Sequence, residues 1–176
     1  SQNLALQFVL LLILTLLNAF FSASEMALVS LNRSRVEQKT AEGDRRYTRL
    51  LSVLDNPNNF LSTIQVGITF IGLLQGASLS ASLGSVIASW FGNFVWAQTA
   101  GSVISLVFLT YISIVLGELY PKRIALNLKE NLAVVSAPVI ILIGKIVSPF
   151  VWLLSASTNL LSRLTPMQFD DADEKM

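Results

Sequence analysis

Oxygen-bearing side chains occur at three points within otherwise apolar stretches of this sequence, and oxygen is the ligand that hard cations prefer. The first point is FFSASEMALVSL, residues 20–31, which contains Ser22, Ser24 and the first charged residue of the chain, Glu25. A carboxylate within a membrane span is costly and by default marks a functional site. The alternative is that Glu25 lies near the end of its helix and is simply hydrated.

The second point is STIQVGITFIGLLQG, residues 62–76. At 100° per residue its small and polar residues fall within a sector of roughly 80° on a helix. These residues are Ser62, Gln65, Thr69, Gly72 and Gly76. Such a stripe is typical of a close-packing face between membrane helices. Its hydroxyl and amide groups also fit an oxygen-lined cavity, and both interpretations stay open at this stage.

The third point is GELYPK, residues 117–122, where Glu118 follows a long uncharged stretch. Pro121 is expected to break the helix and free carbonyl groups of the preceding turn. A carboxylate beside free carbonyls is typical of a cation site built from oxygen. Pairing of Glu118 with Lys122, four residues on, is an equally good interpretation.

The composition narrows the chemistry further. The chain has no histidine and no cysteine, which excludes the common zinc, copper and haem sites, disulfides and a Ser-His-Asp hydrolase. The sequence has no basic face with interleaved aromatic residues, so it does not indicate a nucleic-acid partner. Serines and Lys122 are present, but no pairing of a nucleophile with a base is evident, so we expect no catalytic residues and no enzyme. Any metal must be a hard cation held by oxygen.

The elements that would position these groups are membrane helices. Of the 176 residues, 53% are hydrophobic and only 13% are charged, with no charge before Glu25 and none between Asp55 and Glu118. Uncharged apolar stretches of about 18–20 residues predict spanning helices. We place three of them at 4–31, 60–78 and 98–119. The first lacks a basic segment before it and is too long for a signal peptide, so we expect it to be retained.

The connecting segments predict how the chain is oriented. Residues 32–55 are basic and amphipathic, which places them in the cytoplasm and the N-terminus outside. Gly43-Asp44 should divide this segment into two short helices along the membrane surface. Asn56 to Asn59 form a turn that starts the next helix, with Pro57 near its first position. The small residues at 77–85 and the aromatic patch at 90–96 are expected at the outer turn.

The last apolar zone, residues 132–161, is interrupted by Pro138, Gly144, Lys145 and Pro149. We expect a bent helical hairpin that enters and leaves the inner leaflet, so that the acidic C-terminal tail is cytoplasmic. The predicted fold class is therefore an all-α integral membrane protein. It has three transmembrane helices plus cytoplasmic-side juxtamembrane and half-membrane helical segments.

Taken together, FFSASEMALVSLNRSRV, NPNNFLSTIQVGITFIG and GELYPKRIAL resemble the transmembrane domain of the CNNM/CorC family of magnesium transporters, in this order and spacing. The resemblance covers about residues 4–165. It implies a domain at 1–165 and the start of a linker at 166–176, followed in full-length relatives by cytoplasmic CBS-pair domains. It also implies a homodimer.

The same resemblance implies a magnesium site. The residues at the matching positions are Ser22, Ser24, Ser62, Gly117 and Glu118. Many relatives have asparagine after the glycine of the second motif, whereas Gly67 is followed here by Ile68 and Thr69, which leaves the role of that position open. Glu25 is the less certain member of the site.

The expected function is a divalent-cation transporter that exports Mg²⁺ by alternating access, with Na⁺ as a candidate coupling ion. One carboxylate among neutral oxygens would bind Mg²⁺ loosely, and an ion that must leave again should not be bound tightly. The alternative is a membrane module that senses Mg²⁺ without transporting it and anchors or regulates cytoplasmic domains.

Overall fold

The structure, a computed structural model, describes residues 2–92 and 95–167. All regular elements in these two ranges are helical, as the apolar composition predicts. In chain order they are α1 (Gln2–Val29), α2 (Arg33–Ala41), α3 (Arg45–Asp55), α4 (Asn58–Trp90), α5 (Ala97–Ile114), η1 (Val115–Leu119), α6 (Tyr120–Asn127), α7 (Lys129–Ile146) and α8 (Ser148–Leu164). The predicted all-α fold class is confirmed.

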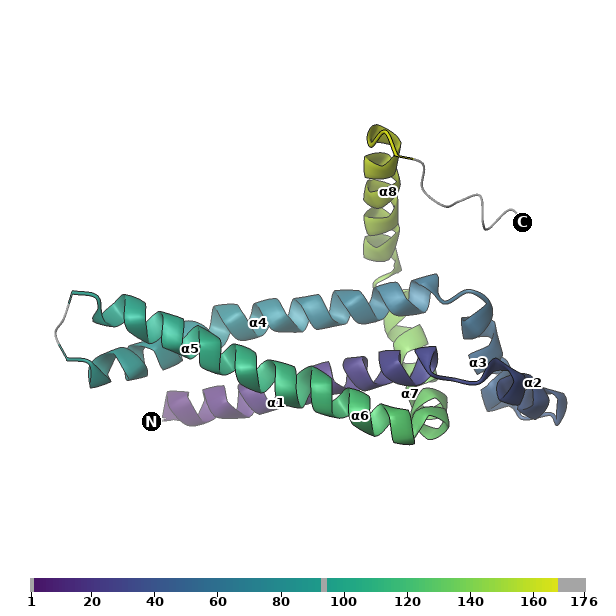
Figure 1. Cartoon of the computed structure of the whole chain (residues 1–176), viewed down its shortest axis with the longest axis horizontal. Helices are drawn as coiled ribbons and strands as arrows, with labels where there is room; N and C mark the ends of the chain where they lie inside the picture. Colours follow the sequence, from purple (N-terminus) through teal and green to yellow (C-terminus); the bar gives the residue numbers. More distant parts are fainter. Residues whose placement is uncertain (1, 93–94, 168–176) are drawn as a thin grey trace.

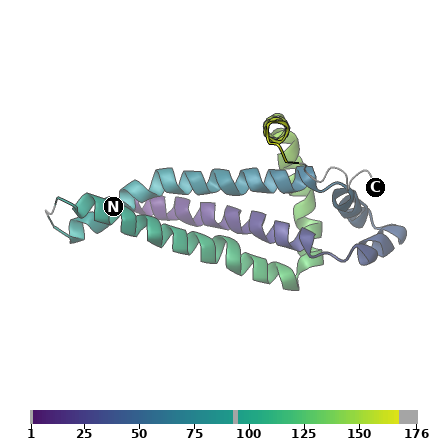
Figure 2. The same cartoon turned by 45° about the horizontal axis from the view of Figure 1, so that its top comes forward.

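Three long helices form the body of the molecule. α1 lies between α4 and the continuous helix formed by α5, η1 and α6 (Figure 2). Within the part of the chain that the structure describes, three segments are long and apolar enough to cross a membrane. They are Ala5–Val29, Asn58–Ala77 and Ala97–Asn127, with mean hydropathies of 2.2, 1.4 and 2.0. The three predicted spans are therefore confirmed.

The outer and inner surfaces of this bundle differ in the way a lipid environment requires. The outer faces carry exposed Leu12, Leu16, Phe70, Val103 and Val107. The interior contains polar side chains from all three helices, namely Thr15, Asn18, Ser22, Gln75 and Ser105. Apolar side chains lose nothing by facing hydrocarbon, whereas polar groups there need partners inside the protein.

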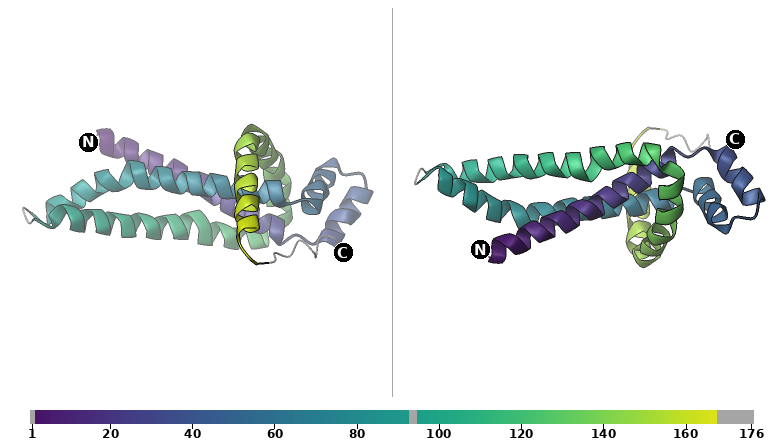
Figure 3. Two further views of the ribbon diagram at one scale, coloured as in Figure 1. Left: turned by 90° about the horizontal axis from the view of Figure 1, so that it is seen from above. Right: turned by 90° about the horizontal axis from the view of Figure 1, so that it is seen from below.

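The connection between α4 and α5 differs from the prediction. Residues 77–85 were expected at the outer turn, but α4 continues as a helix to Trp90. A Cβ on Gly101 would lie 2.4 Å from the carbonyl oxygen of Gly84 and 2.7 Å from the backbone nitrogen of Ala88. The small residues at this end of α4 therefore serve close packing against α5, which extends the hairpin beyond the start of α1 (Figure 3).

The third span also differs from the prediction, because Pro121 does not end it. The helix continues to Asn127, and one π-helical turn, η1, lies directly before Tyr120 and Pro121. The backbone N–H of Tyr120 donates to the carbonyl of Val115, five residues back. Proline has no N–H to donate, and the wider turn before it lets the helix continue without a break.

The predicted pair of short helices after α1 is confirmed. Gly43 has a φ of +95°, a conformation that favours glycine, and it separates α2 from α3. Asn32 caps α2 by accepting from the backbone N–H of Ser34, and Asp44 caps α3 by accepting from that of Arg46, both at 3.0 Å. The side chain of Arg46 also donates to Asp44, which lowers the pKa of that carboxyl.

The last two helices form the bent pair that the sequence predicts. α7 and α8 meet at an angle of 76°, and Pro149 lies in the first turn of α8. α7 crosses the end of the bundle, while α8 projects from it (Figure 1). A Cβ on Gly144 would lie 2.8 Å from the hydroxyl oxygen of Thr63, so glycine allows α7 to approach α4 closely. Entry of this pair into the inner leaflet stays a prediction, and residues 168–176 of the expected linker lie outside the described residues.

The basic residues gather at one end of the bundle. α2, α3 and α6 all lie at the end where α1 finishes, away from the start of α1 (Figure 1). They carry Arg33, Arg35, Arg45, Arg46, Lys122 and Arg123. Arg33 pairs with Asp55 of α3, and Arg35 pairs with Glu130 of α7. These charges thus lie at one end of the bundle, and the sequence pattern predicts that this end is cytoplasmic.

Candidate cation site

α1 and the helix formed by α5 and η1 run in the same direction, and their buried residues match in pairs. Leu11 of α1 packs with Leu109 of α5 in a small apolar cluster. One turn further, Thr15 and Ser113 are joined through Gln75 of α4. The next turn brings Asn18 against Gly117 of η1. This parallel register places Ser22 level with Pro121.

The Thr15 level is a complete hydrogen-bonded group, which we call the paired cluster (Thr15, Gln75 and Ser113). The side-chain amide of Gln75 donates to the hydroxyl oxygen of Thr15 at 3.0 Å. The hydroxyl of Ser113 donates to the amide oxygen of Gln75 at 3.2 Å. One residue from each of the three spans takes part, so the cluster holds the spans together.

The next level toward the basic end is different, and we call it the open cluster (Asn18, Ser22, Gly117 and Glu118). A Cβ on Gly117 would lie 2.6 Å from the side-chain nitrogen of Asn18, so only glycine allows α1 and η1 to approach this closely. Asn18 is 3% exposed and Ser22, one turn further along α1, is 0% exposed. Gly117 and Glu118 lie on the π-helical turn itself.

Two oxygen atoms of the open cluster have no hydrogen-bond partner among the described residues. In the described part of the chain, neither the amide oxygen of Asn18 nor the hydroxyl oxygen of Ser22 makes a hydrogen bond. A buried polar atom without a partner costs about 1–3 kcal/mol. Pro121 also has no N–H to donate to a carbonyl of the preceding turn. Oxygen atoms that lack donors are suited to receive a cation.

Glu118 contributes the carboxylate of this cluster. It is partly exposed, and the ion pairs within the described ranges do not involve it, so the alternative pairing with Lys122 is not formed. No group of three or more His, Cys, Asp or Glu side chains occurs in the ranges 2–92 and 95–167 that could hold a metal by itself. A cation bound at Glu118 would therefore depend mainly on neutral oxygens.

Ser24 is also buried and lies two residues after Ser22, but its hydroxyl has a different environment. Its hydroxyl donates to the backbone carbonyl of Phe20 at 2.7 Å. A hydroxyl that donates in this way still has lone pairs to offer a metal ion. Its role as a ligand stays a prediction. Of these two serines, Ser22 is the one whose hydroxyl has no hydrogen-bond partner among the described residues.

Ser62 lies on another helix and is partly exposed. α4 faces α1 through Ile64 and Gly67, and a Cβ on Gly67 would lie 2.8 Å from the Phe21 ring. No hydrogen bond in the described part of the chain joins Ser62 to α1 or η1. The structure thus brings α1 against η1 at Asn18 and Gly117, one turn from Ser22, whereas the contributions of Glu118 and Ser62 as ligands stay predictions.

The small and polar stripe that begins at Ser62 runs along the outside of α4. Gln65, Thr69 and Gly72 are exposed, and the amide of Gln65 donates to the hydroxyl of Thr69 at 3.2 Å. A Cβ on Gly72 would meet nothing within 4 Å. At these three positions the stripe neither lines a cavity nor packs against another helix of this chain.

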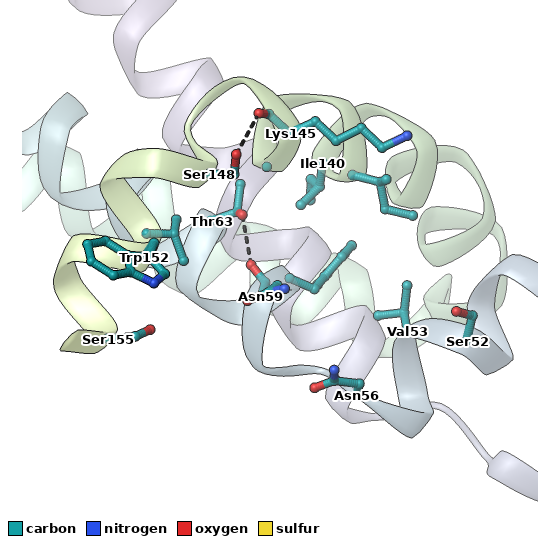
Figure 4. Close-up of a pocket in the computed structure, with 14 residues that line it drawn as sticks. Ser52, Val53, Asn56, Asn59, Thr63, Ile140, Lys145, Ser148, Trp152 and Ser155 are labelled. Atoms are coloured by element: carbon teal, nitrogen blue, oxygen red, sulfur yellow. Dashed lines mark hydrogen bonds between the residues drawn. The ribbon is translucent and has the colours of Figure 1, made fainter. Parts of the chain in front are cut away.

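A cavity of about 850 Å³ lies elsewhere, between α3, α4, α7 and α8 (Figure 4). Asn56, Asn59, Lys145, Ser148 and Trp152 are among its lining residues. Its lining includes none of the five residues at which the family resemblance implies a magnesium site, and the charged side chain in its lining is that of a lysine. A cation with two charges would be repelled by Lys145, so this cavity is not the candidate site.

Sequence reasoning missed Asn18 and the paired cluster. Asn18 is an amide within an apolar stretch and precedes Ser22 by four residues, so its position on the Ser22 face of the helix was visible. Gln75 and Ser113 could not have been connected in this way, because their meeting depends on how α4 and α5 pack.

Comparisons with known proteins agree with this architecture. The model of the cyclin M transmembrane N-terminal domain (CNNM) matches residues 8–176. The UPF0053 protein sll0260 of Synechocystis is 40% identical over 93% of this chain, which covers 38% of that protein. The UPF0053 protein YhdP of Bacillus subtilis is 31% identical over 88% of the chain, covering 36% of that protein.

A third similar protein has a name that states a function. The polyamine export protein of Haemophilus influenzae is 26% identical over 86% of this chain, which covers 36% of that relative. The chain thus spans a little more than a third of the length of these curated relatives. With three apolar spans and a family model that matches nearly its whole length, this multi-pass membrane protein belongs to the CNNM transmembrane-domain family.

Proposed function

We propose that this chain is the membrane-embedded part of a transporter that exports Mg²⁺ by alternating access. The observation that carries the proposal is a single carboxylate, Glu118, on a π-helical turn that packs against α1, where two buried oxygens have no hydrogen-bond partner among the described residues. Mg²⁺ binds oxygen ligands and gives up its water reluctantly, so one carboxylate with several neutral oxygens is a suitable ligand set.

The position of the cluster supports transport. It lies between α1 and the third span, and the apolar pair Leu11–Leu109 and the paired cluster separate it from the start of α1. The site is closed by packing on the side of the start of α1, and it lies nearer the basic end of the bundle. This arrangement matches one state of an alternating-access cycle. A storage site would instead gather several carboxylates to hold the ion tightly.

Polyamines are a second candidate cargo, because one relative is named as a polyamine export protein. A polyamine carries several separated ammonium groups, each of which needs an acceptor. The open cluster offers one carboxylate and a tightly packed approach between Asn18 and Gly117. This geometry favours a small cation over an extended one.

The alternative from a different class is a module that binds Mg²⁺ without moving it and regulates cytoplasmic domains. Flux distinguishes the two, since a sensor binds but does not transport. We would reconstitute the purified chain into liposomes containing a Mg²⁺-sensitive dye and apply a Mg²⁺ gradient, with Glu118→Gln as the matched control. Transport predicts flux in the wild type that the variant lacks.

The same liposomes test the remaining parts of the proposal. Flux that depends on a Na⁺ gradient would support Na⁺ as the coupling ion, and spermidine in place of Mg²⁺ tests the other cargo. Binding without flux of either cation would favour the sensor. We further propose a homodimer whose full-length form carries cytoplasmic CBS-pair domains, and light scattering in detergent measures the oligomeric state.

The proposed orientation has the N-terminus outside and the basic end in the cytoplasm, where the C-terminus also lies. The chain has no cysteine, so single cysteines can be placed without a background. A cysteine at Ser1 should react with an impermeant reagent from outside, and one at Arg45 only from the cytoplasmic side. The reverse pattern would contradict this orientation.

A further inference from the structure

A buried asparagine faces the proposed magnesium site from α1. Asn18 is almost fully buried, its side-chain nitrogen closely approaches Gly117, and its amide oxygen has no hydrogen-bond partner in the described part of the chain. We propose that the amide oxygen of Asn18 is a further ligand of the transported cation, an inference that rests on the proposed function.

The neighbouring level of the bundle shows what a structural amide looks like in this protein. Gln75 is also buried, and both its amide nitrogen and its amide oxygen have hydrogen-bond partners on the other two spans. A purely structural Asn18 should be satisfied in the same manner, because unpaired amides are costly in an apolar interior. In the described part of the chain, the amide oxygen of Asn18 instead has no hydrogen-bond partner.

The location of the free oxygen agrees with a role in binding. Ser22 lies one turn further on the same face of α1, and its hydroxyl oxygen is also buried without a partner in residues 2–92 and 95–167. Gly117 lies opposite Asn18 on η1, Glu118 follows it on the same π-helical turn, and Pro121 has no N–H to donate to that turn. α1 thus contributes two neutral oxygens, and η1 contributes the carboxylate and backbone oxygens.

An amide oxygen is a suitable addition to this set. It is a hard ligand of the kind found in magnesium and calcium sites, and it adds no charge. With Asn18 as ligand the site keeps a single formal negative charge. The ion is then held by more oxygens without the strong attraction that a second carboxylate would add.

The test compares Asn18→Leu with Thr15→Val, both measured as the purified full chain in detergent. Thr15 lies on the same face of α1 and is also buried, but its hydroxyl accepts from Gln75. Asn18→Leu should weaken Mg²⁺ binding roughly 5- to 150-fold in calorimetry without lowering the melting temperature. Thr15→Val should lower the melting temperature and leave Mg²⁺ affinity within about twofold.

Unchanged Mg²⁺ affinity in Asn18→Leu would overturn the inference. An equal loss of affinity in Thr15→Val would also overturn it, because general disturbance of the bundle would then explain both. A wild-type chain that binds no Mg²⁺ would instead remove the proposed function itself, so the two failures are distinguishable.

Asn18→Asp provides a second measurement in case leucine prevents folding. It keeps the shape of the side chain and adds a carboxylate at the same place. At pH 8 it should bind Mg²⁺ at least about tenfold more tightly and transport it more slowly, because release becomes harder. Affinity equal to that of the wild type would overturn the role of Asn18 as a ligand.

Discussion

The paired cluster and the open cluster draw on adjacent turns of α1, and their α1 residues are all buried, yet the two clusters differ in how their polar atoms are used. Thr15 and Gln75 are each 5% exposed and hydrogen-bonded across helices. Asn18 and Ser22 are as deeply buried, and their oxygen atoms have no partner within the described ranges. Burial alone therefore does not distinguish a structural polar group from one available to a ligand.

The difference has a structural cause. At the paired cluster all three spans have regular α-helical backbone, and side chains from each can meet at hydrogen-bond distance. At the open cluster the third span changes to a π-helical turn, and glycine replaces a side chain opposite Asn18. π-helical turns occur frequently at functional sites, and here one lies against Asn18.

The substitution with the largest expected effect on Mg²⁺ affinity is at the carboxylate of the open cluster. Glu118→Gln removes the only formal charge that the proposed site provides to the cation. We expect Mg²⁺ affinity in calorimetry to fall at least about 100-fold, since loss of one member of a partly buried charge pair costs about 3–5 kcal/mol. The melting temperature should change little, and unchanged binding would remove Glu118 from the site.

The serines should show smaller and graded effects. Ser22→Ala should weaken Mg²⁺ binding roughly 5- to 150-fold, because a contact to a charged group is worth about 1–3 kcal/mol. Ser24→Ala and Ser62→Ala should weaken it less, since Ser24 already donates to Phe20 and Ser62 is partly exposed. Affinity is again measured by calorimetry, and wild-type affinity in Ser62→Ala would favour a packing role for that residue.

The close contact between α4 and α5 lies away from the open cluster, and we expect its disruption to lower the stability of the fold. Gly101→Ala places a Cβ against the backbone of Gly84 and should cost about 1–3 kcal/mol of stability. Gly72→Ala is the matched control, because a Cβ there meets nothing in this chain. Thermal unfolding followed by circular dichroism measures both, and equal melting temperatures would contradict the close packing.

Breaking the paired cluster should affect stability while leaving binding unchanged. Gln75→Leu removes two interhelical hydrogen bonds and leaves two hydroxyl groups without partners. We expect a loss of about 1–2 kcal/mol, because such bonds within membranes contribute about 0.6–1.7 kcal/mol each. The melting temperature and Mg²⁺ affinity should be measured on the same sample. A large loss of affinity would show that the two clusters act as one unit.

The smallest effect lies outside both clusters, at the cap of α3. The pKa of Asp44 is lowered in the folded protein by the side chain of Arg46, so its charge contributes stability above the unfolded pKa of about 3.9. This contribution is lost as the pH falls through the lowered pKa. Helical content of wild type and Asp44→Ala should therefore differ slightly at pH 7 and converge near pH 3. Asp44→Asn keeps the cap without the charge, so its difference from Asp44→Ala should not change with pH.

Much of this architecture could be predicted from the sequence. Long uncharged stretches predicted three spans because hydrocarbon excludes charge, and Gly43 and Pro149 predicted the points where helices change direction. Local rules failed where packing decides. Residues 77–85 resemble a turn in composition, yet α4 continues through them as a helix, and Gly84 lies in close contact with α5.

The sequence by itself determined which residues could hold a hard cation, since it offers oxygen ligands and no histidine or cysteine. It also determined which end of the bundle carries the basic residues. Only the tertiary structure decided which of the polar residues are free to bind. Thr15 and Asn18 are both polar residues on one face of a helix, and their sequence context hardly separates them. Whether a hydrogen-bond partner reaches each one depends on the helices packed against it. Gln75 of α4, which also accepts from Ser113, donates to Thr15, whereas a glycine on a π-helical turn meets Asn18.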